Sequence, residues 1–565
     1  MTVTVLETRK ARPGDMGRLG ISLLLAFVTL AIVVATLPDA GVTWDEPLYI
    51  KASRGYMTWL GLLRRGLQQR DLSEALSDQT IVRWWVQDPT LELHPPLGKF
   101  LSGLTWATLR GSLGSISAHR LSNSLLFSVL VGLIFWMVSA AYDTASGVFA
   151  ALSLPLMPRM FFHAHLANID TTVAITWFVA MYVYWRCESR PGWIAVAANG
   201  LAFGLALATK MNAVLIPIVW AMWALLFRRN WRSLLRIAAS TAIGAGVFVA
   251  TWPWLYHDPA NRLLYYFLMA SRFKDRPQFY LGQTLPHVPW HYPFVITLAV
   301  VPLAITVMSL LGIVRVLQST TGSTPTAGTS KQTTGKPTAR ETGWLLLLNA
   351  LVPLLFAATG LQASYSGERH FIPAYPYVAC LAGLGFGGVL NLLLSGWQRL
   401  YGRGNVVRVR LLIAALLVLL LVPPLLAMIR IHPYQLSYYS ELVGGLPGAT
   451  GLGLETTFWC ETYQDALPYL NENAEAGAAV WAENPFVLRF YQQSDMLRQD
   501  LQISGGDTVS PWTADYAVVE MRQTGFSYTP EILSVMAQRQ PIYTLAHQGV
   551  ALLHVYKIKR TWIGT

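Results

Sequence analysis

The sequence predicts a polytopic α-helical membrane protein that carries a small α/β domain at its C-terminal end. Of its 565 residues, 53% are hydrophobic and only 13% are charged, and few soluble proteins of this length have so little charge. Several apolar runs are roughly 20 residues long, which is enough to cross a bilayer as a helix. Basic residues recur between these runs, as in cytoplasmic loops.

The net charge and the cysteines narrow the range of partners. The net charge of +12 is explained by the basic loops and by contact with anionic lipid headgroups. The basic residues are spread between the spans instead of forming one patch, so nucleic acid is not expected as a partner. The wide spacing of Cys187, Cys380 and Cys460 argues against a zinc site or a disulfide framework.

The first apolar run sets the predicted orientation. Residues 1–18 are expected in the cytoplasm because four basic residues precede the run. The run, at about 19–37, is longer than the apolar core of a signal peptide, so we interpret it as an uncleaved helix. It opens a transmembrane domain that is predicted to extend over residues 19–430.

About eleven spans are expected in this domain. The first is followed by a long outer loop, residues 38–118, whose apolar and tryptophan-rich stretches predict amphipathic helices in the membrane interface. Spans 2 to 4 are expected near 120–140, 145–161 and 170–186, and the last near 411–428.

Two further segments differ from the spans in composition. Residues 319–342 are rich in Thr, Ser and Gly and are predicted to form a flexible cytoplasmic linker. From residue 431 polar residues dominate, and short apolar strands at 478–481 and 516–519 alternate with helical patterns. A hairpin at 543–557 closes the chain, so residues 431–565 are predicted to form an extracytoplasmic α/β domain.

Ten titratable residues fall at the predicted outer ends of spans or in outer loops. Charge near hydrocarbon is costly, so such a cluster at one depth indicates a shared site, although each residue alone is better explained by ordinary interfacial charge. Asp45 and Glu46 follow the first span, where a carboxylate can accept a proton from a hydroxyl. A helix cap is the alternative, especially for Glu46. The other members are His94, Lys99, Asp170, Lys210, His257, Glu368, Arg369 and His370.

The basic members suit a phosphate group. The turn His94-Pro95-Pro96-Leu97-Gly98-Lys99 is stiffened by its prolines, which gives His94 a fixed direction and lets Lys99 face headgroups. Lys210 lies between two apolar runs and either reaches the interface or meets an anion. Arg369 has the fork geometry to hold a phosphate, and the alternative is an ion pair with Glu368 or another carboxylate. No glycine-rich phosphate loop is found, so a nucleotide substrate is not supported.

With these residues assembled, the chain resembles the GT-C superfamily of membrane glycosyltransferases. It is most similar to the protein O-mannosyltransferase-like family, with kinship to the lipid A aminoarabinose transferases. The resemblance covers about residues 20–430. It rests on Asp45-Glu46, the turn from His94 to Lys99, Asp170, Lys210 and Gly367-Glu368-Arg369-His370. The C-terminal domain departs from the eukaryotic pattern, because it is not a β-trefoil of the MIR type.

The resemblance implies a hexosyl- or pentosyltransferase of a bacterial-type inner membrane. The sugar would pass from a polyprenyl-phosphate donor to a hydroxyl of a lipid, glycan or protein on the outer face. Asp45 is implied as the catalytic base, or as the acidic group that engages the acceptor, with Glu46 beside it and Asp170 as a second acidic site residue. The donor phosphate would be held by Lys210 and Arg369, with His94, Lys99 and His370 nearby. No cofactor is required, although a divalent metal ion could bridge Asp45 and Asp170.

Two other functions are compatible with a membrane protein of this composition. A transporter or flippase of lipid-linked sugars would place charges or broken helices near the middle of the membrane. A non-catalytic assembly scaffold would use its outer α/β domain to bind a partner.

Overall fold

Six helices in the described part of the chain are long and apolar enough to cross a membrane. Lipid offers the backbone no hydrogen-bond partners, so an apolar run closes its own N–H···O=C bonds as a helix. The computed structural model describes residues 13–86, 88, 93–189, 192–272, 276–319, 336–361, 366–401 and 406–558. The six helices are α1 (Pro13–Ala35), α6 (Ser115–Ala141), α12 (Trp231–Thr251), α16 (Ala339–Ala358), α17 (Tyr375–Tyr401) and α18 (Val406–Ile431).

The other apolar runs form shorter helices. Two of the expected spans are each divided in two at a proline-containing break, because proline has no N–H for the helix ladder. The described part of the chain is therefore largely helical and multi-span, with six long apolar helices and several shorter ones where about eleven spans were expected. The shorter helices are α7 (Thr144–Ser153), α8 (Pro158–His163), α9 (Ile169–Cys187), α10 (Trp193–Leu207), α11 (Ile216–Phe227), α14 (Tyr292–Val300) and α15 (Leu303–Gln318).

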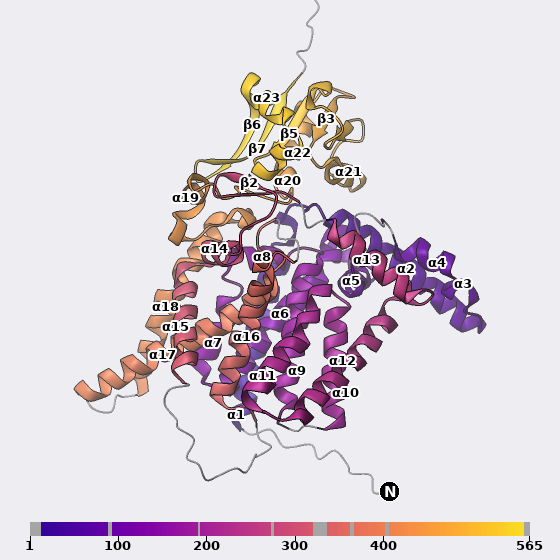
Figure 1. The fold of residues 1–565 in the computed structure, drawn as a ribbon. Helices are drawn as coiled ribbons and strands as arrows, with labels where there is room; N and C mark the ends of the chain where they lie inside the picture. Colours follow the sequence, from indigo (N-terminus) through magenta and orange to yellow (C-terminus); the bar gives the residue numbers. More distant parts are fainter. Residues whose placement is uncertain are drawn as a thin grey trace, which may run out of the picture.

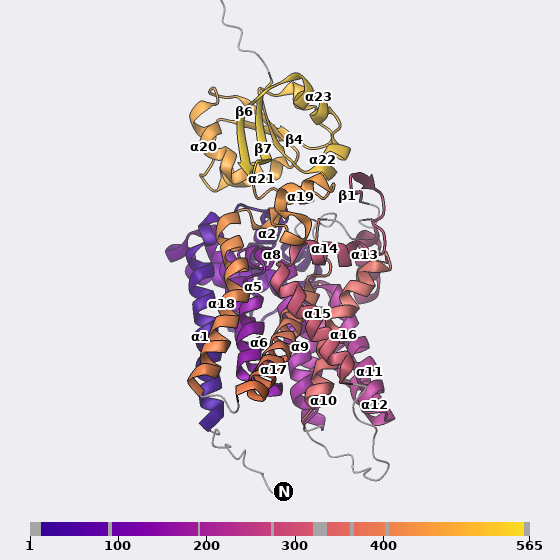
Figure 2. The same ribbon diagram turned by 90° about the vertical axis from the view of Figure 1, so that its left-hand side faces the viewer.

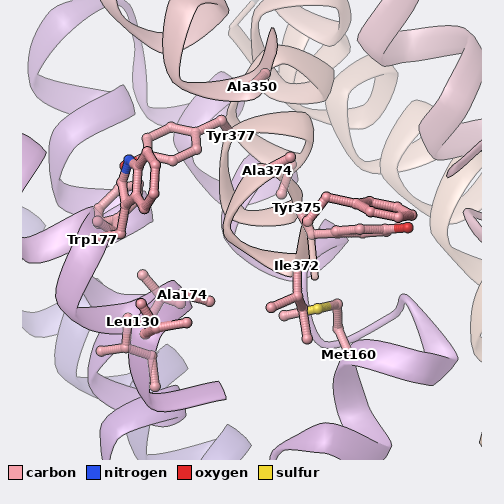
Figure 3. Close-up of a cluster of buried hydrophobic side chains, with 14 of the residues drawn as sticks. Leu130, Met160, Ala174, Trp177, Ala350, Ile372, Ala374, Tyr375 and Tyr377 are labelled. Atoms are coloured by element: carbon pink, nitrogen blue, oxygen red, sulfur yellow. The ribbon is translucent and has the colours of Figure 1, made fainter. Parts of the chain in front are cut away.

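The bundle core lies where α6, α9, α16 and α17 meet (Figure 3). Trp177 of α9 and Tyr377 of α17 are both fully buried there. The indole N–H of Trp177 donates to the side-chain oxygen of Asn349 at 2.8 Å, so this buried polar group is satisfied. These helices form the wall behind the candidate site.

The described part of the predicted outer loop is largely helical, and its helices lie together at one end of the bundle (Figures 1 and 2). Helices α2 and α4 have polar and apolar faces, as expected for helices in a membrane interface. They are α2 (Glu46–Gln69), α3 (Ser73–Leu76), α4 (Asp78–Trp85) and α5 (Leu97–Leu113), with α13 (Pro259–Ser271) beside them. Near α13 a short hairpin joins β1 (Gln278–Tyr280) to β2 (Gln283–Leu285).

The C-terminal domain lies at this same end of the bundle, opposite the end where α1 begins (Figure 2). Its five strands have the order β4-β3-β5-β7-β6, and the central strand β5 is buried along its whole length. Strand β3 is parallel to β4 and β5, and the hairpin of β6 and β7 is antiparallel. The predicted strands are confirmed. The elements are α20 (Tyr463–Asn473), β3 (Ala479–Ala482), α21 (Pro485–Gln493), β4 (Gln502–Gly505), β5 (Tyr516–Glu520), α22 (Gln523–Tyr528), α23 (Glu531–Gln538), β6 (Pro541–His547) and β7 (Val550–Lys557).

A largely irregular stretch joins α18 to this domain. It begins with short turns and α19 (Gly445–Gly451) and continues as residues 452–462, here called the connecting segment. Residues 454–462 are all buried. The backbone N–H of Trp44 donates to the carbonyl of Trp459 at 2.9 Å, so the connecting segment packs against the loop that precedes α2.

Some sequence expectations lie outside the described residues. These are residues 1–12 of the expected cytoplasmic N-terminus, residues 320–335 of the expected linker, and the C-terminal residues 559–565.

Candidate functional site

Asp45 is placed at the start of α2 without capping it. It occupies the N-cap position, yet its side chain makes no capping hydrogen bond. The carboxylate is therefore available for contacts with other parts of the chain. Its side chain is 20% exposed, which is more than the other acidic group of the cluster.

Three other predicted residues reach the same place from separate elements. Asp170 lies in the first turn of α9 and is fully buried. Lys210 is in extended backbone between α10 and the short turn η2 (Met211–Leu215). Arg369 lies in the turn between α16 and α17.

These four residues form one network of ion pairs. Arg369 donates to Asp45 through one terminal nitrogen, and its Nε donates to Oδ2 of Asp170 at 3.0 Å. The Nζ of Lys210 donates to the other oxygen of Asp170 at 2.5 Å. Two carboxylates and two cations balance, as a buried charge cluster requires. Arg369 is 324 residues from Asp45 along the chain, so the fold alone brings the two together.

Glu46 lies outside this network, although it is next to Asp45 in the sequence. It is fully buried, and both its oxygens accept from the guanidinium of Arg120, at 2.9 and 2.8 Å. The backbone N–H groups of Thr43 and Ala167 also donate to it. Glu46 therefore holds the loop before α2 against α6.

The proline turn brings His94 and Lys99 to the neighbourhood of the network. The N–H of Leu97 donates to the carbonyl of Ala208 at 2.9 Å, which ties the turn to the end of α10. Lys99 is buried and does not face headgroups: its Nζ donates to the carbonyl of His94 at 2.7 Å. Burial, together with Lys210 and Lys99, lowers the pKa of His94 to about 3, so this imidazole is neutral.

His370 has a similar environment. Burial lowers its pKa far below the usual value, and the positive charges of Lys210 and Arg369 act in the same direction. Two neutral imidazoles therefore accompany the two cations. A neutral imidazole can accept or donate one hydrogen bond per nitrogen without adding charge.

Glu368 belongs to a second buried pair. Arg159 donates to it at 2.8 Å, and His163 lies 3.5 Å from its other oxygen. Burial alone would raise the pKa of Glu368, but Arg159 outweighs this effect and the pKa falls to about 2. Arg159 and His163 were not among the sequence-predicted residues, because each stands in an apolar stretch that gives no motif.

Trp459 is another residue that sequence reasoning missed. Its indole Nε1–H donates to Oδ2 of Asp45 at 3.2 Å, and the guanidinium carbon of Arg369 lies 3.8 Å from the centre of its ring. It comes from the connecting segment, for which the sequence suggested no chemistry. His257, in contrast, lies apart from the network and contacts the carbonyl of Leu76.

The described residues do not fit a divalent metal ion. No group of three or more His, Cys, Asp or Glu side chains among them has the spacing of a metal site. Both oxygens of Asp170 are engaged by Lys210 and Arg369, and Arg369 bridges the two carboxylates. The guanidinium of Arg369 therefore lies between Asp45 and Asp170, where the sequence allowed a bridging metal ion.

A family model described as "Dolichyl-phosphate-mannose-protein mannosyltransferase" matches residues 93–257. Curated protein sequences give no match. Among solved structures, ArnT from Cupriavidus metallidurans bound to undecaprenyl phosphate is similar, with 14% identity and a TM-score of 0.49 over 97% of this chain and 99% of its own. The archaeal oligosaccharyltransferase AglB from Archaeoglobus fulgidus, solved with an inhibitory peptide and a dolichol-phosphate, has 10% identity and a TM-score of 0.48 over 98% and 75% of the two chains.

Proposed function

We propose that this chain, whose residues 93–257 match the mannosyltransferase family model, is a membrane glycosyltransferase of the GT-C type that transfers a sugar from a polyprenyl-phosphate donor to an acceptor hydroxyl. We place the reaction on the outer face of the membrane, at the end of the bundle that carries the α/β domain. His94, Lys99, Asp170 and Lys210 lie within the matched residues.

The observation that supports this proposal most is the convergence of Asp45, Asp170, Lys210 and Arg369. A base and two phosphate-seeking cations are the groups that such a transfer needs. They meet in one network, and Asp45 is its most accessible carboxylate. Asp45 can therefore meet an acceptor, while the cations lie deeper.

In the proposed reaction, Asp45 takes the proton of the acceptor hydroxyl, and the oxygen attacks the anomeric carbon of the sugar. The bond between that carbon and the phosphate oxygen breaks, and polyprenyl phosphate leaves. Lys210 and Arg369 stabilise the charge on the leaving phosphate. Each step of this scheme uses only side chains of this chain.

Donor binding would also prepare the base. Arg369 pairs with Asp45 in this structure, so a phosphate that takes up the guanidinium releases Asp45. Asp170 and Lys210 remain paired and hold the deeper half of the network. Glu46 is given a structural role instead of a catalytic one, because both of its carboxylate oxygens accept hydrogen bonds from Arg120.

The purified protein can be incubated with a panel of polyprenyl-phosphate sugars, and released polyprenyl phosphate measured by mass spectrometry. Replacing Asp45→Asn should lower turnover by about 100-fold or more, because the general base is removed. The matched control is Asp39→Asn, since Asp39 lies in the same loop but is exposed and contacts His432 at 2.9 Å.

Normal turnover in the Asp45→Asn protein would contradict the assigned base. Movement of the intact donor across a vesicle membrane, without released lipid phosphate, would instead favour a flippase. Loss of activity in both Asn variants would point to damage to the loop.

A further inference from the structure

We propose that Trp459, in the connecting segment, is a positioning residue of the transfer site. The inference rests on the proposed function, because it assigns Trp459 to the network that contains Asp45 and Arg369. It also makes the connecting segment a contributor to that network.

Trp459 contacts both members of the outer ion pair. Its indole N–H and a terminal nitrogen of Arg369 donate to the same oxygen of Asp45. The guanidinium lies over the face of its ring, 3.8 Å from the centre, where a cation is attracted by the π-electrons. Trp459 is 1% exposed, so its ring and its N–H are both enclosed by the protein.

The backbone at this position is unusual. Trp459 and Cys460 have φ angles of +96° and +69°, a region that side-chain-bearing residues rarely adopt. Such a conformation persists only where the surroundings determine it, and it is commonly found at functional sites.

Contacts from two directions hold this backbone. The N–H of Cys460 donates to both oxygens of Glu520, at 3.0 and 3.2 Å, at the end of strand β5. The carbonyl of Trp459 accepts from Trp44, immediately before Asp45. Gly41 lies so close that a Cβ there would be 1.8 Å from the carbonyl oxygen of Glu461. The indole is therefore placed by the sheet on one side and the first loop on the other.

This arrangement gives Trp459 a role that Arg369 cannot fill. When a phosphate draws the guanidinium away, the indole N–H remains on Asp45 and keeps the carboxylate oriented toward the acceptor. The loss of this N–H should therefore slow the chemical step more than it weakens donor binding.

The test is Trp459→Phe, which keeps a flat apolar ring and removes the N–H. We expect kcat to fall about tenfold or more while KM for the donor changes by less than about twofold.

The matched control is Trp481→Phe. Trp481 is fully buried in the sheet domain, and its N–H donates to the carbonyl of Val509 at 2.7 Å, away from the site. This control should lower the melting temperature but leave kcat within about twofold of the wild type. A kcat for Trp459→Phe within the same range, or an equal fall in both variants, would overturn the proposal.

A second measurement does not depend on the proposed function. Asp45→Asn and Trp459→Phe are combined, and the changes in melting temperature of the single and double variants are compared. Direct contact predicts a non-additive pair, whereas Asp45→Asn with Trp481→Phe should be additive. If no donor gives product with the wild-type protein, the proposed transfer fails, and this comparison still decides the placement of Trp459. Additive changes for Asp45 and Trp459 would refute it.

Discussion

At the scale of single residues, two adjacent carboxylates have separate tasks. Asp45 and Glu46 follow one another, but one points into the network of Arg369 and the other into a buried pair with Arg120. The difference arises at the helix start, where successive side chains point in different directions around the axis. An adjacent acidic pair is therefore not by itself a pair of catalytic groups.

The two should respond differently to mutation. Glu46→Ala leaves the buried guanidinium of Arg120 without its carboxylate, and breaking such a pair costs about 3–5 kcal/mol of folding stability. We expect a large fall in melting temperature, measured in detergent. Glu74→Ala, which removes an exposed carboxylate from α3, is the control and should leave the melting temperature nearly unchanged. A stable but inactive Glu46→Ala protein would assign Glu46 to the chemistry instead.

Glu461 provides a further single-residue test, through pH. Burial raises the pKa of Glu461 to about 7, and nearby Asp465 acts in the same direction, while the hydrogen bond from Thr457 and the charge of Arg159 lower it. One of its oxygens accepts from Thr457 at 2.7 Å, and the other has no hydrogen-bond partner among the described residues.

Because the folded carboxyl of Glu461 holds its proton to higher pH than the unfolded one, it makes the protein less stable as pH rises. The unfolded carboxyl loses its proton near its ordinary pKa of 4.5, before the folded one does, so stability falls as pH rises from 4.5 to about 7. Glu461→Gln should therefore stabilise the protein at pH 8, by on the order of 2 kcal/mol, and change little at pH 4.5. Melting curves at both pH values check this, with exposed Glu472→Gln as the control. Equal effects of Glu461→Gln at the two pH values would contradict a raised pKa.

At the scale of elements, close helix crossings hold the bundle together. Helices α15 and α17 approach so closely that a Cβ on Gly312 would lie 2.0 Å from the carbonyl oxygen of Leu381. A Cβ on Gly385 would lie 1.9 Å from that of Met308. In lipid, where burial of apolar surface adds little between helices, such close backbone packing is a main source of helix association.

A single methyl group should disturb this crossing. Gly385→Ala forces the two backbones apart and should cost about 1–3 kcal/mol. Gly396→Ala, on the same helix, has nothing within 4 Å of the added Cβ and is the matched control. Thermal unfolding in detergent compares the two, and equal melting temperatures would show that the crossing adapts without cost.

At the scale of the whole molecule, the sequence predicted those helices and strands whose pattern lies within one continuous segment. Hydropathy predicted the long helices, and short apolar runs predicted β3 and β5, because these signals lie within a single element. The final hairpin was also predicted. The breaks near Pro155 and Pro302 were missed, since an apolar run counted by length looks like one span. Residues 38–118 were expected to contain interfacial helices, but the 24-residue length of α2 was not foreseen.

The site was predicted only in part, for a related reason. Asp45, Asp170, Lys210 and Arg369 could be selected because charge beside apolar runs is conspicuous, and the structure brings them together. The sequence could not predict which carboxylate pairs with which cation, since the pairs depend on how distant helices pack. Trp459 gave no signal at all, because one more tryptophan in an aromatic-rich chain is unremarkable until its neighbours are known.

The contact between the first loop and the connecting segment sets an order of assembly. Asp45 and Trp459 are separated by 414 residues, so the ribosome makes one end of this contact long before the other. A nascent chain that has inserted the helices up to α18 still lacks the indole that contacts Asp45 and Arg369. The network of Asp45, Asp170, Lys210 and Arg369 thus acquires this contact only after residue 459 has been made, and a polypeptide truncated after α18 would lack it.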